Sequence, residues 1–207
     1  MPEKFLFQPL KPFNICQFFG DDMACISNED NKTILVKQNH SVCPVSFRSL
    51  YSNMNGHNGL DIPAKRWQPI YAAQSGRVDE VCTEVARGLG VGVRTLAPNG
   101  KWYRHRYWHL IAIDVESGDE LNTGDLIGYA DSTGFSSGDH LHFELKEVDR
   151  DGRVLNQGNG YFGAVDPLPF MENKFALEIK GIVSTISLIR EKLAILSDLV
   201  ADWLRNR

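Results

Sequence analysis

The sequence predicts a mainly β fold, an antiparallel β-sheet domain followed by a long C-terminal amphipathic helix. Between residues 69 and 148, short β-prone runs alternate with turns rich in glycine and asparagine, which is typical of strands joined by tight connections. From about residue 175 to 204, the apolar residues change to a helical period. We therefore expect a β domain over 1–170 and a helical segment over 171–207.

Composition and charge narrow the class of protein. The chain has 207 residues, 43% of them hydrophobic and 23% charged, which suffices for one folded domain with a buried core. Its net charge of −4 argues against a nucleic-acid-binding surface, because phosphate binding requires a concentrated basic face. No run of eighteen apolar residues is present, so we expect no membrane span. The N-terminus lacks the apolar stretch of a Sec signal peptide.

The N-terminal quarter has the weakest periodicity. We predict a first strand at 13–20, then a long surface loop or insertion over about 21–55 with a short strand candidate at 33–37. Loops of that length are uncommon unless they are functional. The cysteines have no Cys-x-x-Cys spacing, so a structural zinc knuckle is not expected, and a Cys25–Cys43 disulfide stays open. The four are Cys16, Cys25, Cys43 and Cys82.

The middle of the chain reads as successive strands. The dipeptide Asn99-Gly100 between two β-like runs predicts a hairpin. On its second arm, the odd positions His105, Tyr107 and His109 are expected to share one face. We interpret His105 as a solvated hairpin residue, whereas His109 stands at the strand's end, where site residues often lie. Strands are expected at 69–73, 76–82, 92–97, 102–110 and 125–130.

Two short motifs carry candidate metal ligands. In the stretch 138–145, His140 and His142 are two apart on a β-prone run, so both imidazoles should lie on one face of a strand. Upstream, His57 and Asp61 are four apart in a segment whose glycines and proline disfavour a helix, and in an extended segment they also share a face. Taken singly, each motif is a weak signal, since polar surface turns and half-exposed strands carry such pairs by chance.

Together the motifs supply one plausible metal centre. His57, Asp61 and His142 are three nitrogen or oxygen donors of the kind that catalytic zinc prefers, with a fourth position left for water. His109 and His140 then remain as imidazoles able to transfer protons. The convergence of three separate segments on one chemistry is more specific than any single motif.

The chain resembles the lysostaphin-like (LytM-type) zinc endopeptidases, which cut peptide cross-links of bacterial peptidoglycan. The resemblance covers about residues 10–170. The motifs that carry it are Gly56-His57-Asn58-Gly59-Leu60-Asp61, Tyr107-Trp108-His109-Leu110, Ser117-Gly118-Asp119-Glu120-Leu121, Thr123-Gly124-Asp125-Leu126-Ile127-Gly128, Ser132–Glu144 with its His140-Leu141-His142, and the closing Asp166-Pro167.

This resemblance implies a fold, an activity and roles for individual residues. It implies that His57, Asp61 and His142 bind Zn²⁺ and that His109 and His140 are the catalytic histidines, their individual roles not assigned. Tyr51 is the candidate for a tyrosine that stabilises the tetrahedral intermediate in some relatives. The implied substrate is peptidoglycan, so the protein would act outside the cytoplasm, in an extracellular, periplasmic or virion-associated setting.

The resemblance also leaves alternatives. Residues 136–139, Ser-Ser-Gly-Asp, depart from the family's usual Ser-Thr-Gly-Pro and add a carboxylate beside His140. A catalytically inert domain of the same fold, binding peptidoglycan or activating a hydrolase, is the first alternative; against it, none of the metal ligands is missing. A phage virion component with retained lytic activity is the second. Which bond is cut does not follow from the sequence.

The C-terminal segment shows a heptad pattern. Large apolar residues are spaced alternately four and three apart, which forms the a/d seam of a coiled coil. Two interpretations carry about equal weight: the helix packs on its own β domain, or it self-associates through residues 182–204. The seam consists of Ile182, Ile186, Ile189, Leu193, Leu196, Val200 and Trp203.

Overall fold

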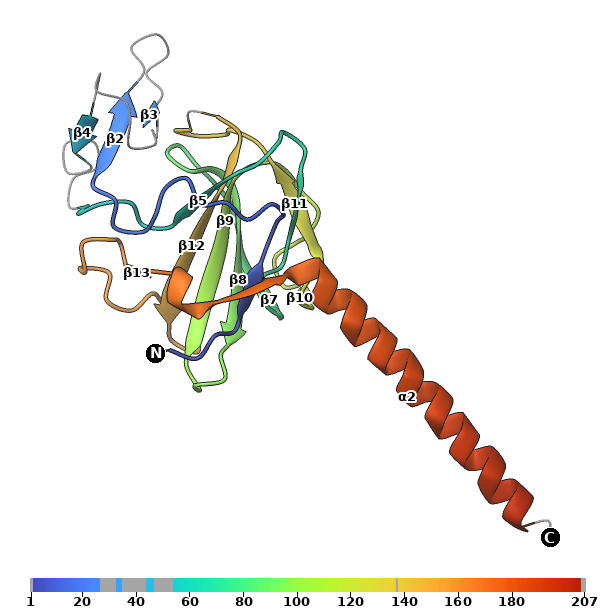
Figure 1. Ribbon diagram of the computed structural model, residues 1–207. Coiled ribbons are helices and arrows are strands. Elements are labelled where there is room, and N and C mark those ends of the chain that lie inside the picture. Colours follow the sequence, from blue (N-terminus) through green and yellow to red (C-terminus); the bar gives the residue numbers. More distant parts are fainter. Residues whose placement is uncertain (1, 27–32, 35–43, 47–53, 137, 206–207) are drawn as a thin grey trace.

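The computed structural model describes residues 2–26, 33–34, 44–46, 54–136 and 138–205. Its centre is a nine-stranded, antiparallel sheet (Figure 1). The strands follow one another in the order β10-β7-β8-β9-β11-β6, and β12 pairs with β9, β5 and β13. The bounds are β5 (Leu60–Pro63), β6 (Pro69–Tyr71), β7 (Gly76–Glu84), β8 (Gly88–Leu96), β9 (Trp102–Ile113), β10 (Glu120–Leu121), β11 (Leu126–Ala130), β12 (His140–Val148) and β13 (Ala164–Val165).

Strand β9 changes its partner at the position that matters most for the site. Its residues 102–108 pair with β12, whereas residues 110–113 pair with β11. The end of β11 and the start of β12 therefore meet beside His109, whose carbonyl accepts a hydrogen bond from Asp131 N at 2.9 Å. The predicted hairpin at Asn99-Gly100 is confirmed, because β8 and β9 run antiparallel on either side of it.

The hydrophobic core lies on one face of the sheet. Along β12, Leu141, Phe143 and Leu145 are fully buried in the core cluster, while the intervening residues point to the opposite face. This alternation is the one predicted from the sequence. Two flanking strands, β1 (Leu6–Gln8) and β14 (Met171–Phe175), pair in parallel. The buried residue Phe5 comes just before β1, and the buried residue Ala176 comes just after β14.

The N-terminal expectations are partly corrected. The predicted strand at 13–20 is not formed; the segment runs beside β5 with a single bridge between Gln17 and Asp61. Within the predicted insertion over 21–55, the structure describes a three-stranded sheet of β2 (Met23–Ile26), β3 (Thr33–Ile34) and β4 (Pro44–Ser46), in the order β3-β2-β4. The side chain of Cys25 and all of Cys43 lie outside the described residues, so their disulfide stays a prediction.

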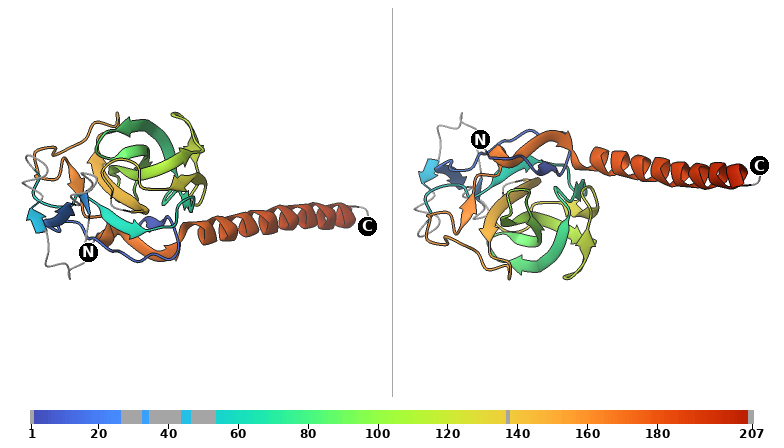
Figure 2. Two further views of the ribbon diagram at one scale, coloured as in Figure 1. Left: turned by 90° about the horizontal axis from the view of Figure 1, so that it is seen from above. Right: turned by 90° about the horizontal axis from the view of Figure 1, so that it is seen from below.

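The C-terminal helix, α2 (Ala176–Arg205), forms as the heptad pattern predicts. The short 3-10 helix η1 (Leu168–Phe170) precedes β14, and α2 follows β14 directly. The helix leads away from the β domain in all three views (Figures 1 and 2). Two ion pairs hold its first turns, Lys11 to Glu178 at 2.7 Å and Lys180 to Asp125 at 2.8 Å. In the part of the chain that the structure describes, no helix has the length and apolarity needed to cross a bilayer.

The helix does not pack along its own domain. The seam residues from Ile182 to Leu196 each expose 44–59% of their surface. Of the two interpretations offered by the sequence, docking onto the β domain is therefore not what this structure shows. The boundary that we predicted at 170/171 falls just before β14, which pairs with β1 and so connects the helix to the domain.

Candidate metal centre and active site

Three donor atoms from two strands and a loop converge in a buried triangle. His57 precedes β5, Asp61 is the second residue of β5, and His142 is the third residue of β12. His57 Nε2 lies 3.1 Å from Asp61 Oδ1 and 3.0 Å from His142 Nδ1, and His142 Nδ1 lies 2.8 Å from Asp61 Oδ1. The pairing of Asp61 with His142 across β5 and β12 brings the two motifs together.

The triangle has the dimensions of a metal site. Tetrahedral ligands at about 2.0–2.1 Å from zinc are themselves roughly 3.3 Å apart, close to the three distances observed here. All three residues are at most 6% exposed. Asp61 Oδ2 and His142 Nε2 are buried and have no hydrogen-bond partner within the described part of the chain. Two imidazole nitrogens and a carboxylate directed at one point are a donor set that fits a divalent cation.

Local contacts orient the ligands. A carbonyl can only accept, so His57 Nδ1–H donates to Phe18 O at 3.1 Å, which leaves His57 Nε2 as the donor atom for a metal. Gly59 allows the loop to lie against the ring of His142: a Cβ there would stand 2.8 Å from His142 Cε1 and 2.6 Å from Phe143 O. The glycine in the His-x-Gly-x-Asp motif is therefore required by close packing.

The electrostatics of the triangle favour one negative charge. Burial alone would raise the pKa of Asp61, but His57 and His140 outweigh burial and hold this pKa well below its usual value. Burial lowers the pKa of His57, yet the facing Asp61 carboxylate outweighs burial and raises it. Burial is the dominant effect on His142, whose pKa is lowered. The carboxylate is thus ionised at neutral pH and available to a cation.

Two further histidines stand beside the triangle with a defined tautomer. His109 Nδ1–H donates to Thr133 O at 2.6 Å, and His140 Nδ1–H donates to Gly138 O at 2.7 Å. Because both carbonyls can only accept, Nε2 is the acceptor atom of either ring when that ring is neutral. The centroids of the two rings are 4.6 Å apart, and His140 Nε2 lies 3.6 Å from Asp61 Oδ1. Burial and the neighbouring histidines lower the pKa of His109 to about 3, so His109 is neutral at pH 7.

A β-bulge aims His109 at the site. Leu89 pairs with Leu110 and Val91 with Tyr107, so two residues of β9, Trp108 and His109, oppose Gly90 alone. His109 takes a φ of 64°, and the centroid of its ring lies 5.9 Å from that of the His142 ring. Gly90 is needed because a Cβ would stand 2.1 Å from the Trp108 ring. The predicted common face of His105, Tyr107 and His109 is therefore wrong for His109.

The other sequence-predicted residues have different outcomes. His105 is fully buried in the core rather than solvated, and its Nδ1 hydrogen-bonds to the Tyr107 hydroxyl at 2.8 Å. Tyr51 lies outside the described residues. Sequence reasoning missed Asn58 and Glu144, two buried polar residues that contact each other beneath the triangle. Both lie within the quoted motifs, but nothing in the spacing indicated their contact.

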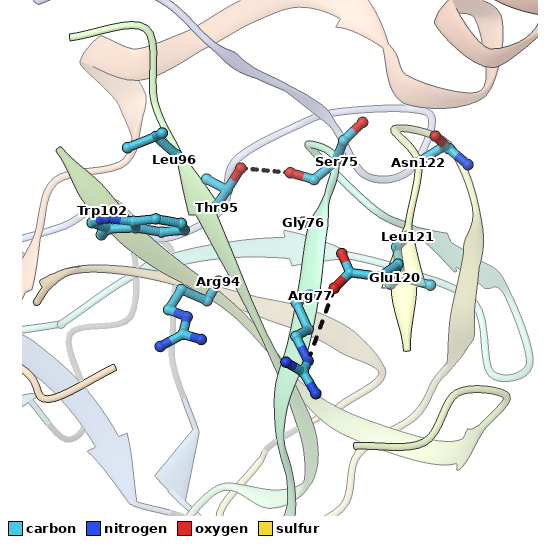
Figure 3. Close-up of a pocket in the computed structure, with 10 residues that line it drawn as sticks. All are labelled: Ser75, Gly76, Arg77, Arg94, Thr95, Leu96, Trp102, Glu120, Leu121 and Asn122. Carbon is cyan, nitrogen blue, oxygen red and sulfur yellow. Dashed lines mark hydrogen bonds and ion pairs between the residues drawn. The ribbon is translucent and has the colours of Figure 1, made fainter. Parts of the chain in front are cut away.

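A depression of about 600 Å³ lies away from this centre, at the ends of β7, β8, β9 and β10 (Figure 3). None of the five predicted histidine and aspartate residues lines it. Several of its polar groups have partners nearby: Arg77 faces Glu120 at 3.9 Å, Thr95 Oγ1 donates to Ser75 O, and Arg94 Nη1 donates to Arg150 O at 2.6 Å. We assign no function to it.

Comparison with known sequences decides the family. Residues 55–162, just over half of the chain, match the family described as Peptidase family M23. The chain belongs to peptidase family M23. The M23 segment contains all five residues of the centre, and the lysostaphin-like resemblance expected from the motifs is thereby confirmed.

The M23 domain is similar to bacterial endopeptidases. The chain is 31% identical over 122 residues to the glycyl-glycine endopeptidase ALE-1 of Staphylococcus capitis and 31% identical over 118 residues to lysostaphin of Staphylococcus simulans. It is 34% identical over 89 residues to the peptidoglycan DD-endopeptidase ShyA of Vibrio cholerae. These matches cover 58%, 56% and 43% of this chain but 30%, 22% and 20% of the relatives, so it spans less than a third of their length.

Solved structures share the fold of the M23 domain. LytU superposes with a TM-score of 0.50 at 25% identity, covering 78% of this chain and 86% of that chain. A zinc-containing peptidase from Vibrio cholerae has a TM-score of 0.51 at 22% identity, covering 79% of this chain and 39% of that chain, a likeness of fold alone. The predicted fold class, an antiparallel β domain of the lysostaphin-like type with a C-terminal helix, is confirmed.

Proposed function

We propose that this M23 protein is a zinc-dependent endopeptidase that hydrolyses peptide cross-links of bacterial peptidoglycan. The observation that carries the proposal is the buried triangle of His57, Asp61 and His142, with edges of 2.8–3.1 Å, beside two histidines of defined tautomer. The endopeptidase names of ALE-1 and ShyA support the substrate class. Such a substrate places the protein's action at the cell wall, outside the cytoplasm.

In this proposal the ligand residues bind and the flanking residues move protons. His57 Nε2, Asp61 Oδ1 and His142 Nδ1 would hold zinc, which when bound supplies a Lewis acid that acidifies water and polarises a carbonyl. His140 Nε2 lies 3.6 Å from Asp61 Oδ1, and the ring of His109 lies beside that of His140. One ring, neutral at Nε2, takes a proton from the attacking water, and the other, when protonated at Nε2, supports the oxyanion or gives that proton to the leaving amine. Tyr51 remains a proposed contributor to oxyanion support.

The test pairs zinc content with cleavage on the same preparations of the full chain. Purified sacculi of several cross-link types are digested, and the new termini are identified by mass spectrometry. Wild-type protein should carry about one zinc and release cross-link fragments, and chelation should abolish release. His57→Ala, Asp61→Ala and His142→Ala should lose zinc and cleavage together. Cleavage by metal-free protein would overturn the zinc requirement.

The two catalytic candidates should separate from the ligands. His109→Ala and His140→Ala should keep zinc near the wild-type level while turnover falls about 10²-fold or more. Zinc lost from His140→Ala but kept by His142→Ala would mean that the roles of this pair are reversed. If wild-type protein binds sacculi and zinc but creates no new termini, the alternative of an inert binding domain replaces the proposal.

We also propose that α2 self-associates with a second copy of the chain. Its a/d side chains Ile182, Ile186, Ile189, Leu193 and Leu196 are about half exposed, and they repeat with a 3.5-residue period that fits a helix of the same period. Covering the exposed half of each contributes on the order of 1 kcal/mol, hence about 10 kcal/mol for two helices.

That gain is comparable with the cost of association, which is about 4–15 kcal/mol. Val183, Leu188 and Ile195, also exposed by about half, widen the apolar stripe and shift the balance toward association. Since the helix leads away from the β domain (Figure 2), a second copy can approach this stripe without displacing the catalytic centre.

A further inference from the structure

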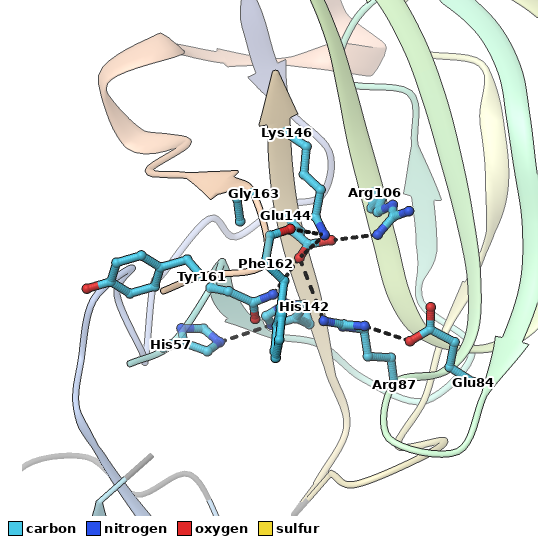
Figure 4. A network of polar contacts seen from close by, with 12 residues as sticks. His57, Glu84, Arg87, Arg106, His142, Glu144, Lys146, Tyr161, Phe162 and Gly163 are labelled. Atoms are coloured by element: carbon cyan, nitrogen blue, oxygen red, sulfur yellow. Dashed lines mark hydrogen bonds and ion pairs between the residues drawn. The ribbon is translucent and has the colours of Figure 1, made fainter. Parts of the chain in front are cut away.

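A fully buried carboxylate, Glu144, lies two residues beyond His142 on the site face of β12. Three cations surround it: Arg106 Nη1 at 3.3 Å, Lys146 Nζ at 3.4 Å and Arg87 Nη2 at 4.0 Å (Figure 4). The carboxylate is therefore held in place from three sides.

One partner of Glu144 belongs to the metal-binding loop. Asn58, 3% exposed, stands between the ligands His57 and Asp61, and its Nδ2 donates to Glu144 Oε1 at 2.5 Å. This contact joins the segment that carries two ligands to the strand that carries the third. It is a side-chain tie, additional to the backbone pairing of β5 with β12.

The backbone pairing alone does not extend to His57. The β5–β12 register runs from Pro63 opposite His140 to Leu60 opposite Phe143. His57 precedes this ladder, and its backbone bonds instead to the N-terminal segment, with Gly20 N donating to His57 O and His57 N donating to Asp21 O. The Asn58–Glu144 contact is thus placed to hold the His57 end of the loop against β12.

The same carboxylate is tied to a second loop. Lys146 Nζ, beside Glu144, also donates to Phe162 O at 2.9 Å. In Figure 4 the Lys146, Glu144 and His142 side chains line one face of β12, with Phe162 beside them. Glu144 is therefore the common partner of a ligand-bearing loop and of a residue that holds the loop around Phe162.

We propose that Asn58 and Glu144 are positioning residues for the metal centre, which set its zinc affinity by holding His57 in register with Asp61 and His142. The proposal rests on the zinc function proposed above. Partners behind metal ligands typically contribute about 10–100-fold to metal affinity, because a misplaced ligand must be reoriented each time the metal binds. Neither residue touches the metal in this arrangement; both act through His57 and its loop.

The test measures the zinc dissociation constant of the full chain by competition with a chromophoric chelator. Asn58→Ala and the similarly sized Asn58→Leu should both weaken zinc binding about 10–100-fold. The matched control is Asp79→Asn, which breaks another largely buried ion pair on the same sheet face, to Arg104 Nη2 at 2.7 Å, away from the triangle. Asp79→Asn should leave zinc affinity within about two-fold of wild type, even where it lowers the stability of the zinc-free protein.

A double-mutant cycle tests the coupling. If Glu144 acts through Asn58, Glu144→Gln should weaken zinc binding in the wild-type background and add little in the Asn58→Ala background. Additive effects would overturn the coupling, as would wild-type affinity in both Asn58 variants or equal weakening by Asp79→Asn. Failure of the wild-type protein to bind zinc would refute the proposed function instead, so the two failures are distinguishable.

Discussion

A histidine buried in the core should make this M23 domain sensitive to acid independently of its active site. His105 is fully buried on β9. Ala73 N donates to the Tyr107 hydroxyl at 2.7 Å, and that hydroxyl lies 2.8 Å from His105 Nδ1. His105 Nε2 has no hydrogen-bond partner among the described residues. Burial lowers the pKa of His105 from 6.5 to about 3.

The sign and size of the effect follow from proton linkage. The unfolded chain binds a proton at His105 near pH 6.5, whereas the folded protein binds it only near pH 3. Its contribution to stability is therefore complete above pH 6.5 and is lost as the pH falls toward 3. The loss is about 1.4 kcal/mol per pH unit, or about 3 kcal/mol between pH 7 and pH 4. Domains of this size have total stabilities of about 5–15 kcal/mol, so the loss is a large fraction.

The measurement compares wild type with His105→Asn, whose amide oxygen can still accept from Tyr107 but does not titrate. Urea unfolding is followed by tryptophan fluorescence at pH 7, 6, 5 and 4, with chelator present so that zinc release does not contribute. His105→Asn should be less stable at pH 7 yet lose about 3 kcal/mol less than wild type on acidification. Equal losses would refute the assignment of a buried, neutral His105.

The remaining predictions concern the geometry of the site and the helix. Gly90→Ala would place a methyl group against the Trp108 ring and displace the bulge that aims His109, so turnover should fall at least 10-fold with zinc retained; unchanged turnover would contradict this role. Gly59→Ala would press on Phe143 O and His142, so zinc affinity should fall, and titration with the chelator checks it. Leu193→Glu should reduce the mass in light scattering to that of a monomer with cleavage of small substrates unchanged. A wild-type chain that is already monomeric at high concentration would exclude self-association.

Several site residues were predictable because their motifs are local. His140 and His142 lie on one face of β12, and Asp61 lies on β5, as alternation requires. Glycines in the first motif disfavoured a helix, and the segment leads into strand β5 instead. The helix boundary near residue 176 followed from the change of period. The zinc ligation and the catalytic roles remain proposals that the paired assays test.

Other features could not be read from the sequence. Strict alternation placed His109 with His105, but a bulge opposite Gly90 reversed its direction, and bulges leave no reliable periodic signal. His105 was interpreted as a solvated hairpin residue, but it is buried, and its neighbours Arg104 and Arg106 pair with acidic side chains on the opposite face. Alternation along one strand thus separated a charged face from a buried histidine.

By itself, the sequence determined the β-rich class, the residue types of the centre, the family and the heptad face of the helix, because each depends on short-range spacing. Only the tertiary structure decided that His57, Asp61 and His142 meet at 2.8–3.1 Å, and that Asn58 reaches Glu144 across 86 residues of chain. The tertiary structure also decided that the apolar face of α2 does not pack on the β domain and stays exposed. Such contacts depend on strand order and register, which arise from the whole sheet packing on its core and not from any one segment.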